Sequence, residues 1–525
     1  MNILMKSYFL IIIYFLSVSC LTEKVKKDEF PYIEITISEL SKGYLSGEFT
    51  VHDVVSSYIN RINEIDKNGP NLNSIIEINP DALKIAKQLD VELSSGNVRG
   101  KLHGIPVILK DNIDTADKMS TTAGSRAMVG SNPLQDSFLV KKLRESGAVI
   151  LAKANLSEWA NFRGNNSSSG WSGVIGQTKN PYFLDRNPCG SSSGSAVAVS
   201  ANLTALAIGT ETNGSIVCPS TTNGIVGIKP TVGLISRSGI IPISFTQDTP
   251  GPMARTLEDA VIALGEITGV DEYDSKTLES KKHLLNDYTA FLNLNGLKGK
   301  RIGIYTKPLG INSEVDKLFF KSVDEIKKNG ANIIEIEKIN SEITREVSLK
   351  VMLHEYKDGL NNYFKSLGDN AKIKSLDQLI DFNNKDSIEL KFYNQSYLEL
   401  ANNTMGMNSE EYKKALDNLI KLSREEGIDK VMDEYNLDAI IAPTGNPAWT
   451  TDWINGDRYL VHSSSPAAWA GYPNISIPMG NIHGLPVGIS FFGKAWSEPK
   501  LIEIAYSFEQ KTKARIIPQF KSILN

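Results

Sequence analysis

Cysteine and histidine are scarce in this chain, and their scarcity limits the chemistry that it can support. There are three cysteines and six histidines among 525 residues. The histidines are His52, His103, His283, His354, His462 and His483. Because they are scattered, we expect surface or loop roles for them rather than catalysis. The cysteines have no companion histidine spacing, so the sequence predicts no metal site, and we expect no cofactor.

A surplus of basic residues is also missing. The 56 Lys and Arg residues are outnumbered by 60 Asp and Glu residues, and the formal net charge is −4. The sequence therefore lacks the excess of basic residues that is typical of nucleic-acid-binding proteins. The sequence has no internal repeat, and its 41% hydrophobic residues allow a substantial core. These features are typical of a large globular enzyme; they do not predict its oligomeric state.

The apolar run near the N-terminus is too short to span a membrane. It covers residues 8–16, follows Lys6 and is typical of an export signal. Small residues lead into Cys20, as in a lipoprotein signal, although Ser17 differs from the aliphatic residue usual there. We therefore predict an export signal at 1–20 and a polar linker at 21–34. Membrane contact is expected only through a lipid on Cys20; the alternatives are ordinary cleavage or a retained anchor.

Two glycine- and serine-rich turns carry the most information. Residues 189–195 read Cys-Gly-Ser-Ser-Ser-Gly-Ser, and residues 211–215 read Glu-Thr-Asn-Gly-Ser. Such clusters are commonly flexible linkers, but apolar segments at 196–201 and 203–208 adjoin these two. If the second turn is rigid, its backbone amides converge into a nest that suits an oxyanion. Those amides belong to Thr212, Asn213, Gly214 and Ser215, and Ser215 opens a predicted short helix at 216–222.

A serine nucleophile needs a base, and Lys110 is the candidate. Residues 105–109 form an apolar run that predicts a fully buried strand ending at this lysine. Burial disfavours the ammonium form, so Lys110 can be neutral enough to take a proton. The alternative is an ordinary lysine at the end of a strand that reaches into water.

Seven motifs in order give the chain a specific resemblance. They are Gly-Ile-Pro-Val-Ile-Leu-Lys-Asp-Asn at 104–112, Thr-Thr-Ala-Gly-Ser at 121–125, Gly-Gln-Thr-Lys-Asn-Pro at 176–181, Gly-Ser-Ser-Ser-Gly-Ser at 190–195, Gly-Thr-Glu-Thr-Asn-Gly-Ser at 209–215, Gly-Ile-Lys-Pro-Thr at 227–231 and Asp-Thr-Pro-Gly-Pro-Met-Ala-Arg at 248–255. The chain resembles the amidase signature family from about residue 35 onward. The resemblance implies an α/β fold with a large mixed sheet flanked by helices and an added helical lobe.

The resemblance also implies a Ser-Ser-Lys triad. Ser215 is then the nucleophile, Ser191 a bridging serine held by a cis peptide, and Lys110 the base. The residues alone do not favour Ser191 over Ser192, Ser193 or Ser195; the family spacing of 24 positions before Ser215 selects it. A proton passes from Ser215 through Ser191 to Lys110 and returns to the leaving ammonia or amine.

Two residues depart from the usual pattern: Ser193 replaces a glycine, and Asn213 replaces glycine or aspartate. Asparagine tolerates left-handed backbone, so the second turn is expected to survive. The segments at 191–195, 216–219 and 241–248 resemble the peptide amidase branch, which removes the C-terminal amide from peptides. The alternatives are an amidase of fatty acid or other small amides, and a glutaminase like that of the aminoacyl-tRNA amidotransferases.

Other interpretations stay open. Gly-Ser-Ser-Ser-Gly at 190–194 also matches a G-x-S-x-G elbow with Ser192 as nucleophile and a downstream histidine such as His462 as base. An exported solute-binding lipoprotein is the non-enzyme alternative. Cys189 and Cys218 are expected to be small buried side chains, and the sequence does not decide whether they form a disulfide.

The rest of the chain predicts a single domain at 35–525. Its parts are a signature core at about 100–265, a helical lobe at about 300–435 and a return to the sheet at 436–525. Strands are expected at 300–305, 439–442, 474–478 and 487–492, and helices with serine N-caps at 313–329 and 409–435. Trp449, Trp453, Tyr459 and Trp469 are expected mainly in core packing, with a peptide groove as the alternative.

Overall fold

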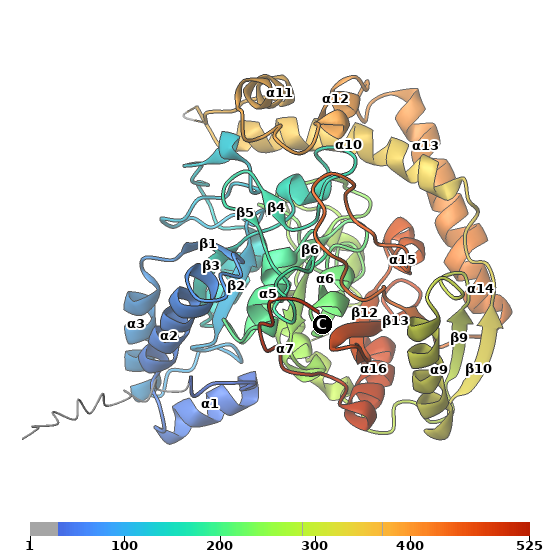
Figure 1. Cartoon of the computed structure of the whole chain (residues 1–525), viewed down its shortest axis with the longest axis horizontal. Helices are drawn as coiled ribbons and strands as arrows, with labels where there is room; N and C mark the ends of the chain where they lie inside the picture. Colours follow the sequence, from blue (N-terminus) through green and yellow to red (C-terminus); the bar gives the residue numbers. More distant parts are fainter. Residues whose placement is uncertain (1–29, 286, 370, 525) are drawn as a thin grey trace, which may run out of the picture.

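One mixed β-sheet runs through the molecule (Figure 1). The computed structural model describes residues 30–285, 287–369 and 371–524. Eleven strands form the sheet in the order β1-β3-β2-β6-β8-β7-β12-β13-β11-β9-β10. Their bounds are β1 Ile75–Ile78, β2 Pro106–Lys110, β3 Val149–Ala154, β6 Leu206–Glu211, β7 Val226–Lys229, β8 Thr249–Ala254, β9 Arg301–Tyr305, β10 Asn332–Ile336, β11 Ala439–Pro443, β12 Asn474–Ile482 and β13 Leu485–Phe492. A separate small pair joins β4 Trp171–Ser172 to β5 Gly176–Gln177.

Strand direction changes along the sheet, which confirms the predicted mixed α/β class. Strands β3, β2 and β6 are parallel, and so are β11, β9 and β10. The strands between β6 and β11 pair with antiparallel neighbours. Strands β2, β3, β6 and β8 are buried along their whole length, which explains why their sequences are almost continuously apolar.

Helices surround the sheet and add a lobe at one end. Their bounds are α1 Ile37–Ser46, α2 Val51–Arg61, α3 Ala82–Ser94, α4 Phe138–Glu145, α5 Ser193–Ser200, α6 Val217–Thr222, α7 Leu257–Ile267, α8 Thr277–Ser280, α9 Ser313–Lys328, α10 Thr344–Ser366, α11 Leu376–Lys385, α12 Ser396–Asn402, α13 Glu410–Ile420, α14 Asp429–Glu434, α15 Ser465–Ala470 and α16 Glu498–Thr512. Helices α10 to α13, drawn in yellow and orange, arch over the top of the molecule in Figure 1.

Several boundaries differ from the sequence predictions. Strands β9 and β10 belong to the central sheet, so the helical lobe begins at α10 rather than at about residue 300. The N-cap of α9 is Asn312, because its side chain accepts the first free amides of the helix. Ser409 does cap α13, but the helix predicted at 409–435 is interrupted at Gly427, whose backbone is not helical.

The predictions for the N-terminus lie mostly outside the described residues. The export signal at 1–20, Cys20 and the linker up to residue 29 are among the residues that the structure does not describe. Residues 30–34, predicted as the end of the linker, instead pack on the domain. The Tyr32 side chain is buried, and the Glu34 amide donates to Asn202 Oδ1 at 2.7 Å.

A buried ion cluster ties the helical lobe to the core. The Arg163 guanidinium donates to Glu158 Oε1 at 3.0 Å and to Glu389 Oε2 at 3.2 Å. Glu389 comes from the segment between α11 and α12, and all three side chains are buried. Because a buried charge requires its partner, this cluster fixes the lobe against the loop that follows β3.

Candidate active site

Lys110 is the last residue of β2, where it lies between β3 and β6 with no exposed surface. Its Nζ atom lies 2.7 Å from Ser191 Oγ. The same Nζ contacts the carbonyl oxygen of Thr210 at 3.1 Å and the Thr210 hydroxyl at 2.8 Å. The lysine therefore does not reach water, which rules out the solvent-exposed alternative.

Burial lowers the pKa of Lys110 to about 7, and the nearby carboxyls of Asp248 and Glu211 act in the opposite direction. A neutral amine has two hydrogens and one lone pair. The two contacts with Thr210 can take the hydrogens, and the lone pair can accept the hydroxyl proton of Ser191. The three neighbours of Nζ therefore accommodate both forms: an ammonium donates to all three, and the neutral amine that a general base requires donates to Thr210 and accepts from Ser191.

The structure distinguishes among the four serines of the first turn. Ser191 follows a cis peptide bond from Gly190 and is the one that contacts Lys110. The hydroxyls of Ser192, Ser193 and Ser195 donate to backbone carbonyls instead. Their acceptors are Thr210, Cys189 and Ile208, at 3.0, 2.5 and 3.2 Å. Three of these hydroxyls therefore hold the turn in place, and Ser191 alone is directed at the amine.

The second turn connects β6 to α6 and lies against the first. The amide of Ser192 donates to the carbonyl of Ser215 at 3.1 Å. Gly214 has φ 86°, a conformation that favours glycine, and Ser215 is 9% exposed. Within the described part of the chain, the amides of residues 213–215 donate to no protein acceptor. The same holds for the amide of Thr212, so all four amides of the predicted oxyanion nest lack a protein acceptor there, and their role in catalysis stays a prediction.

Glu211 and Asn213 hold this turn from its two sides. One carboxylate oxygen of Glu211 accepts the amides of Ile216 and Val217, at 2.8 and 3.0 Å. The helix therefore begins at Val217, one residue after its predicted start. Asn213 is not among the residues with positive φ, so its tolerance of left-handed backbone is not used. Its side chain binds the hydroxyls of residues 464 and 465 at the start of α15 instead.

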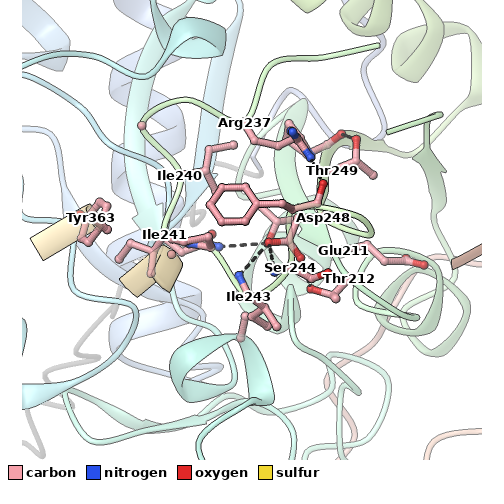
Figure 2. Close-up of a pocket in the computed structure, with 18 of the residues that line it drawn as sticks. Glu211, Thr212, Arg237, Ile240, Ile241, Ile243, Ser244, Asp248, Thr249 and Tyr363 are labelled. Atoms are coloured by element: carbon pink, nitrogen blue, oxygen red, sulfur yellow. Dashed lines mark hydrogen bonds between the residues drawn. The ribbon is translucent and has the colours of Figure 1, made fainter. Parts of the chain in front are cut away.

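A cavity of about 320 Å³ lies beside the end of β6 (Figure 2). Its walls are mainly apolar and include Ile240, Ile241, Ile243, Phe245 and Tyr363. Two of the three charged residues that line it have protein partners. Arg237 binds Asp274 at 2.6 Å, and Asp248 accepts the Thr212 hydroxyl at 2.6 Å and the amides of Ile243 and Ser244. The third is Glu211, whose buried Oε1 has no hydrogen-bond partner among the described residues. The cavity therefore suits a mainly apolar group that carries a hydrogen-bond donor.

The sequence predicts no role for Thr210, Glu211 or Asp248. All three lie inside motifs that carry the family resemblance, and no other signal marks them. Their contacts depend on strand pairing, since β6 lies between β2 and β8. Thr210 Oγ1 also accepts the Asn112 side-chain amide at 3.1 Å, so the amine, the strand and the cavity wall form one network.

Cys189 and Cys218 are joined by a disulfide, which the sequence left undecided. Trp449 and Tyr459 pack beside it, so these two aromatic residues serve the core as expected. Trp453 does not: it is 43% exposed and stacks on Phe392.

The elbow alternative for Ser192 does not fit the fold. An elbow serine follows a strand directly, whereas the described segment before Ser192 is irregular and β5 ends at Gln177. The Ser192 hydroxyl donates to the Thr210 carbonyl and accepts from the Thr210 amide at 3.1 Å. Both bonds tie it to the backbone of β6, so it is not presented as a nucleophile.

Comparison with known proteins establishes the class. The family model described as Amidase matches residues 53–502. The crystal structure of peptide amidase from Stenotrophomonas maltophilia superposes with a TM-score of 0.91 and 48% identity, covering 94% of this chain and all of that one. A probable amidase from Arabidopsis thaliana is 42% identical over 505 residues, which are 94% of this chain and 92% of that protein.

More distant relatives include a component of the glutamyl-tRNA(Gln) amidotransferase of Thermoanaerobacter pseudethanolicus. It is 33% identical over 502 residues, covering 92% of this chain and 98% of that protein. The protein is therefore an enzyme, a hydrolase that acts on linear amide bonds, and not a solute-binding protein. The chain belongs to the amidase signature family.

Proposed function

We propose that this enzyme removes the C-terminal amide from peptides and releases ammonia, using Ser215 as nucleophile, Ser191 as proton bridge and Lys110 as base. The observation that carries the proposal is the contact of 2.7 Å between Lys110 Nζ and Ser191 Oγ in a fully buried setting. The 48% identity to peptide amidase supports the substrate class. A peptide amidase has also been crystallised with the competitive inhibitor chymostatin and matches this chain equally well.

The proposed reaction proceeds through an acyl-enzyme on Ser215. Ser215 attacks the amide carbonyl while its proton passes to Ser191, and the proton of Ser191 passes to Lys110. The amides of residues 213–215 stabilise the oxyanion of the tetrahedral intermediate. The proton returns along the same path to the leaving nitrogen, and ammonia departs. Water then attacks the acyl-enzyme, and the same relay in reverse frees the carboxylic acid and Ser215.

A panel of amides tests the substrate class. Ammonia release is measured with C-terminally amidated dipeptides, free glutamine and asparagine, and a fatty acid amide. We expect the amidated dipeptides to have the highest kcat/KM. A clear preference for free glutamine would favour the amidotransferase-like alternative, and a preference for the fatty acid amide would favour the lipid-amide alternative.

Two variants test the nucleophile. Ser215→Ala should lower kcat by at least about a thousandfold, because the acyl-enzyme no longer forms. Ser193→Gly, in the first turn, restores the residue usual in the family and should keep most of the activity. Full activity in Ser215→Ala would refute the assignment.

We also propose that the protein is exported and lipidated at Cys20. Among residues 30–285, 287–369 and 371–524, no helix is long and apolar enough to cross a bilayer. If the proposal is right, Cys20→Ala moves the protein from the membrane fraction to the soluble fraction. An unchanged distribution would contradict lipidation.

A further inference from the structure

We propose that the Cys189–Cys218 disulfide is a positioning element of the active site, on which the rate of hydrolysis depends. It joins the turn that carries Ser191 to the helix that follows Ser215. The inference rests on the proposed function, because it assigns those two serines to the reaction. It adds a covalent bond to the site and links activity to an oxidising environment.

The positions of the two cysteines make the bond mechanically effective. Cys189 lies two residues before Ser191, and Cys218 lies three residues after Ser215, near the start of α6. Their Cα atoms are 5.9 Å apart, and the side chains are 4% and 1% exposed. Because both links to the serines are so short, a change in the separation of the cysteines also changes the separation of the serines.

Cys189 has a backbone conformation that needs support. Its φ is 57°, in the left-handed region that residues with a Cβ atom seldom adopt. The side chain of Asn187 accepts its amide at 2.8 Å, and its carbonyl accepts the Ser193 hydroxyl at 2.5 Å. The disulfide is the third restraint, and the one that connects this residue to the nucleophile's side of the site.

Noncovalent bonds between the two segments lie on either side of Cys189. Before it, the Pro188 carbonyl accepts from Thr222 and Asn223, at 2.7 and 2.8 Å. After it, Ser192 donates to the Ser215 carbonyl. None of these three bonds involves residue 189 or 190, so the disulfide holds the middle of the turn, directly before Ser191.

The test compares two ways of removing the bond. In Cys189→Ser/Cys218→Ser the bond is lost and the left-handed position keeps a Cβ atom. In Cys189→Gly/Cys218→Ser the bond is also lost, but glycine adopts φ 57° without penalty. We expect kcat for an amidated dipeptide to fall about ten- to a hundredfold in the first variant, with KM changed less than about threefold. The second variant should keep most of that loss, because glycine relieves the backbone at residue 189 but does not replace the link to residue 218.

Labelling of Ser215 by a fluorophosphonate probe should slow in parallel with kcat. The control is Val323→Ala, a buried truncation in α9 that lowers stability away from the site; it should label at the wild-type rate. An unchanged kcat in the serine pair, or full recovery of kcat in the glycine variant, would overturn the positioning role. So would free thiols at both cysteines in active wild-type protein. Wild-type protein that hydrolyses no amide would overturn the proposed function instead.

Discussion

The pH dependence of hydrolysis tests the role of Lys110 directly. Burial lowers the pKa of this amine from 10.5 to about 7. At pH 7 about half of the Lys110 amines are then neutral, against roughly 0.03% for an amine of ordinary pKa, so the base is about a thousand times more available. Since only the neutral amine accepts a proton, kcat/KM should be constant above about pH 8. It should fall about tenfold per pH unit below about pH 6.

The assay follows kcat/KM for an amidated dipeptide from pH 5 to pH 9.5, with the free acid quantified by chromatography. A flat profile between pH 5.5 and 9, or a limb that begins above pH 9, would refute the argument. His462→Gln is the control, because a histidine base would also give an acid limb, and this variant should leave the limb in place. Asp248→Asn should move the limb to lower pH, since the Asp248 carboxylate raises the pKa of Lys110.

Three substitutions test how the site is held. Gly214→Ala should lower kcat by about a hundredfold with little change in KM. The reasons are that Gly214 has φ 86° and that an added Cβ atom would lie 3.2 Å from Ser464 Oγ. Wild-type kinetics in this variant would show that the turn tolerates other conformations. Ser464→Ala removes the hydroxyl that donates to Asn213 Oδ1 at 2.7 Å and should lower kcat about fivefold, the effect of about 1 kcal/mol; a change confined to KM would place this bond in substrate binding. Glu389→Ala removes the carboxylate that accepts from Arg163 and from the Arg126 amide, while Glu158 still pairs with Arg163, and should lower the free energy of unfolding by about 1–3 kcal/mol in urea titrations; a loss below about 0.5 kcal/mol would mean that the cluster does not fix the lobe.

The sequence predicts the buried strand before Lys110 well, because a strand covered on both faces leaves an apolar run. It also predicts the two turns, since local composition determines them. It does not identify Ser191 without the family spacing, because four serines with similar surroundings differ only in which atoms they meet in three dimensions. Thr210 shows the same limit. Its contact with Lys110 spans 100 residues and depends on the pairing of β2 with β6.

The outer parts of the chain show a second limit. The helix predicted at 409–435 has a helical pattern throughout, yet it is interrupted at Gly427. There an added Cβ atom would lie 2.6 Å from Asn340 Nδ2 and 2.7 Å from the Leu422 carbonyl. The first of these contacts involves a segment 87 residues away, which a local pattern cannot report. The disulfide has the same character, because only the fold brings Cys189 and Cys218 within bonding distance.

Burial alone does not make a lysine into a base. Lys110, Lys153 and Lys229 all end or lie in buried strands and have no exposed surface, and burial lowers the pKa of each. Lys229 donates to two backbone carbonyls, which only accept hydrogen bonds and so offer no proton that its lone pair could take. Lys153 lies 3.8 Å from the Asp111 carboxylate, which stabilises its positive charge. Lys153 also lies 2.9 Å from the Thr121 hydroxyl, so a hydroxyl neighbour alone does not make a base. Lys110 instead faces the hydroxyl of Ser191, in the turn that bonds to Ser215 through the Ser192 amide, and that placement makes this buried amine the candidate base.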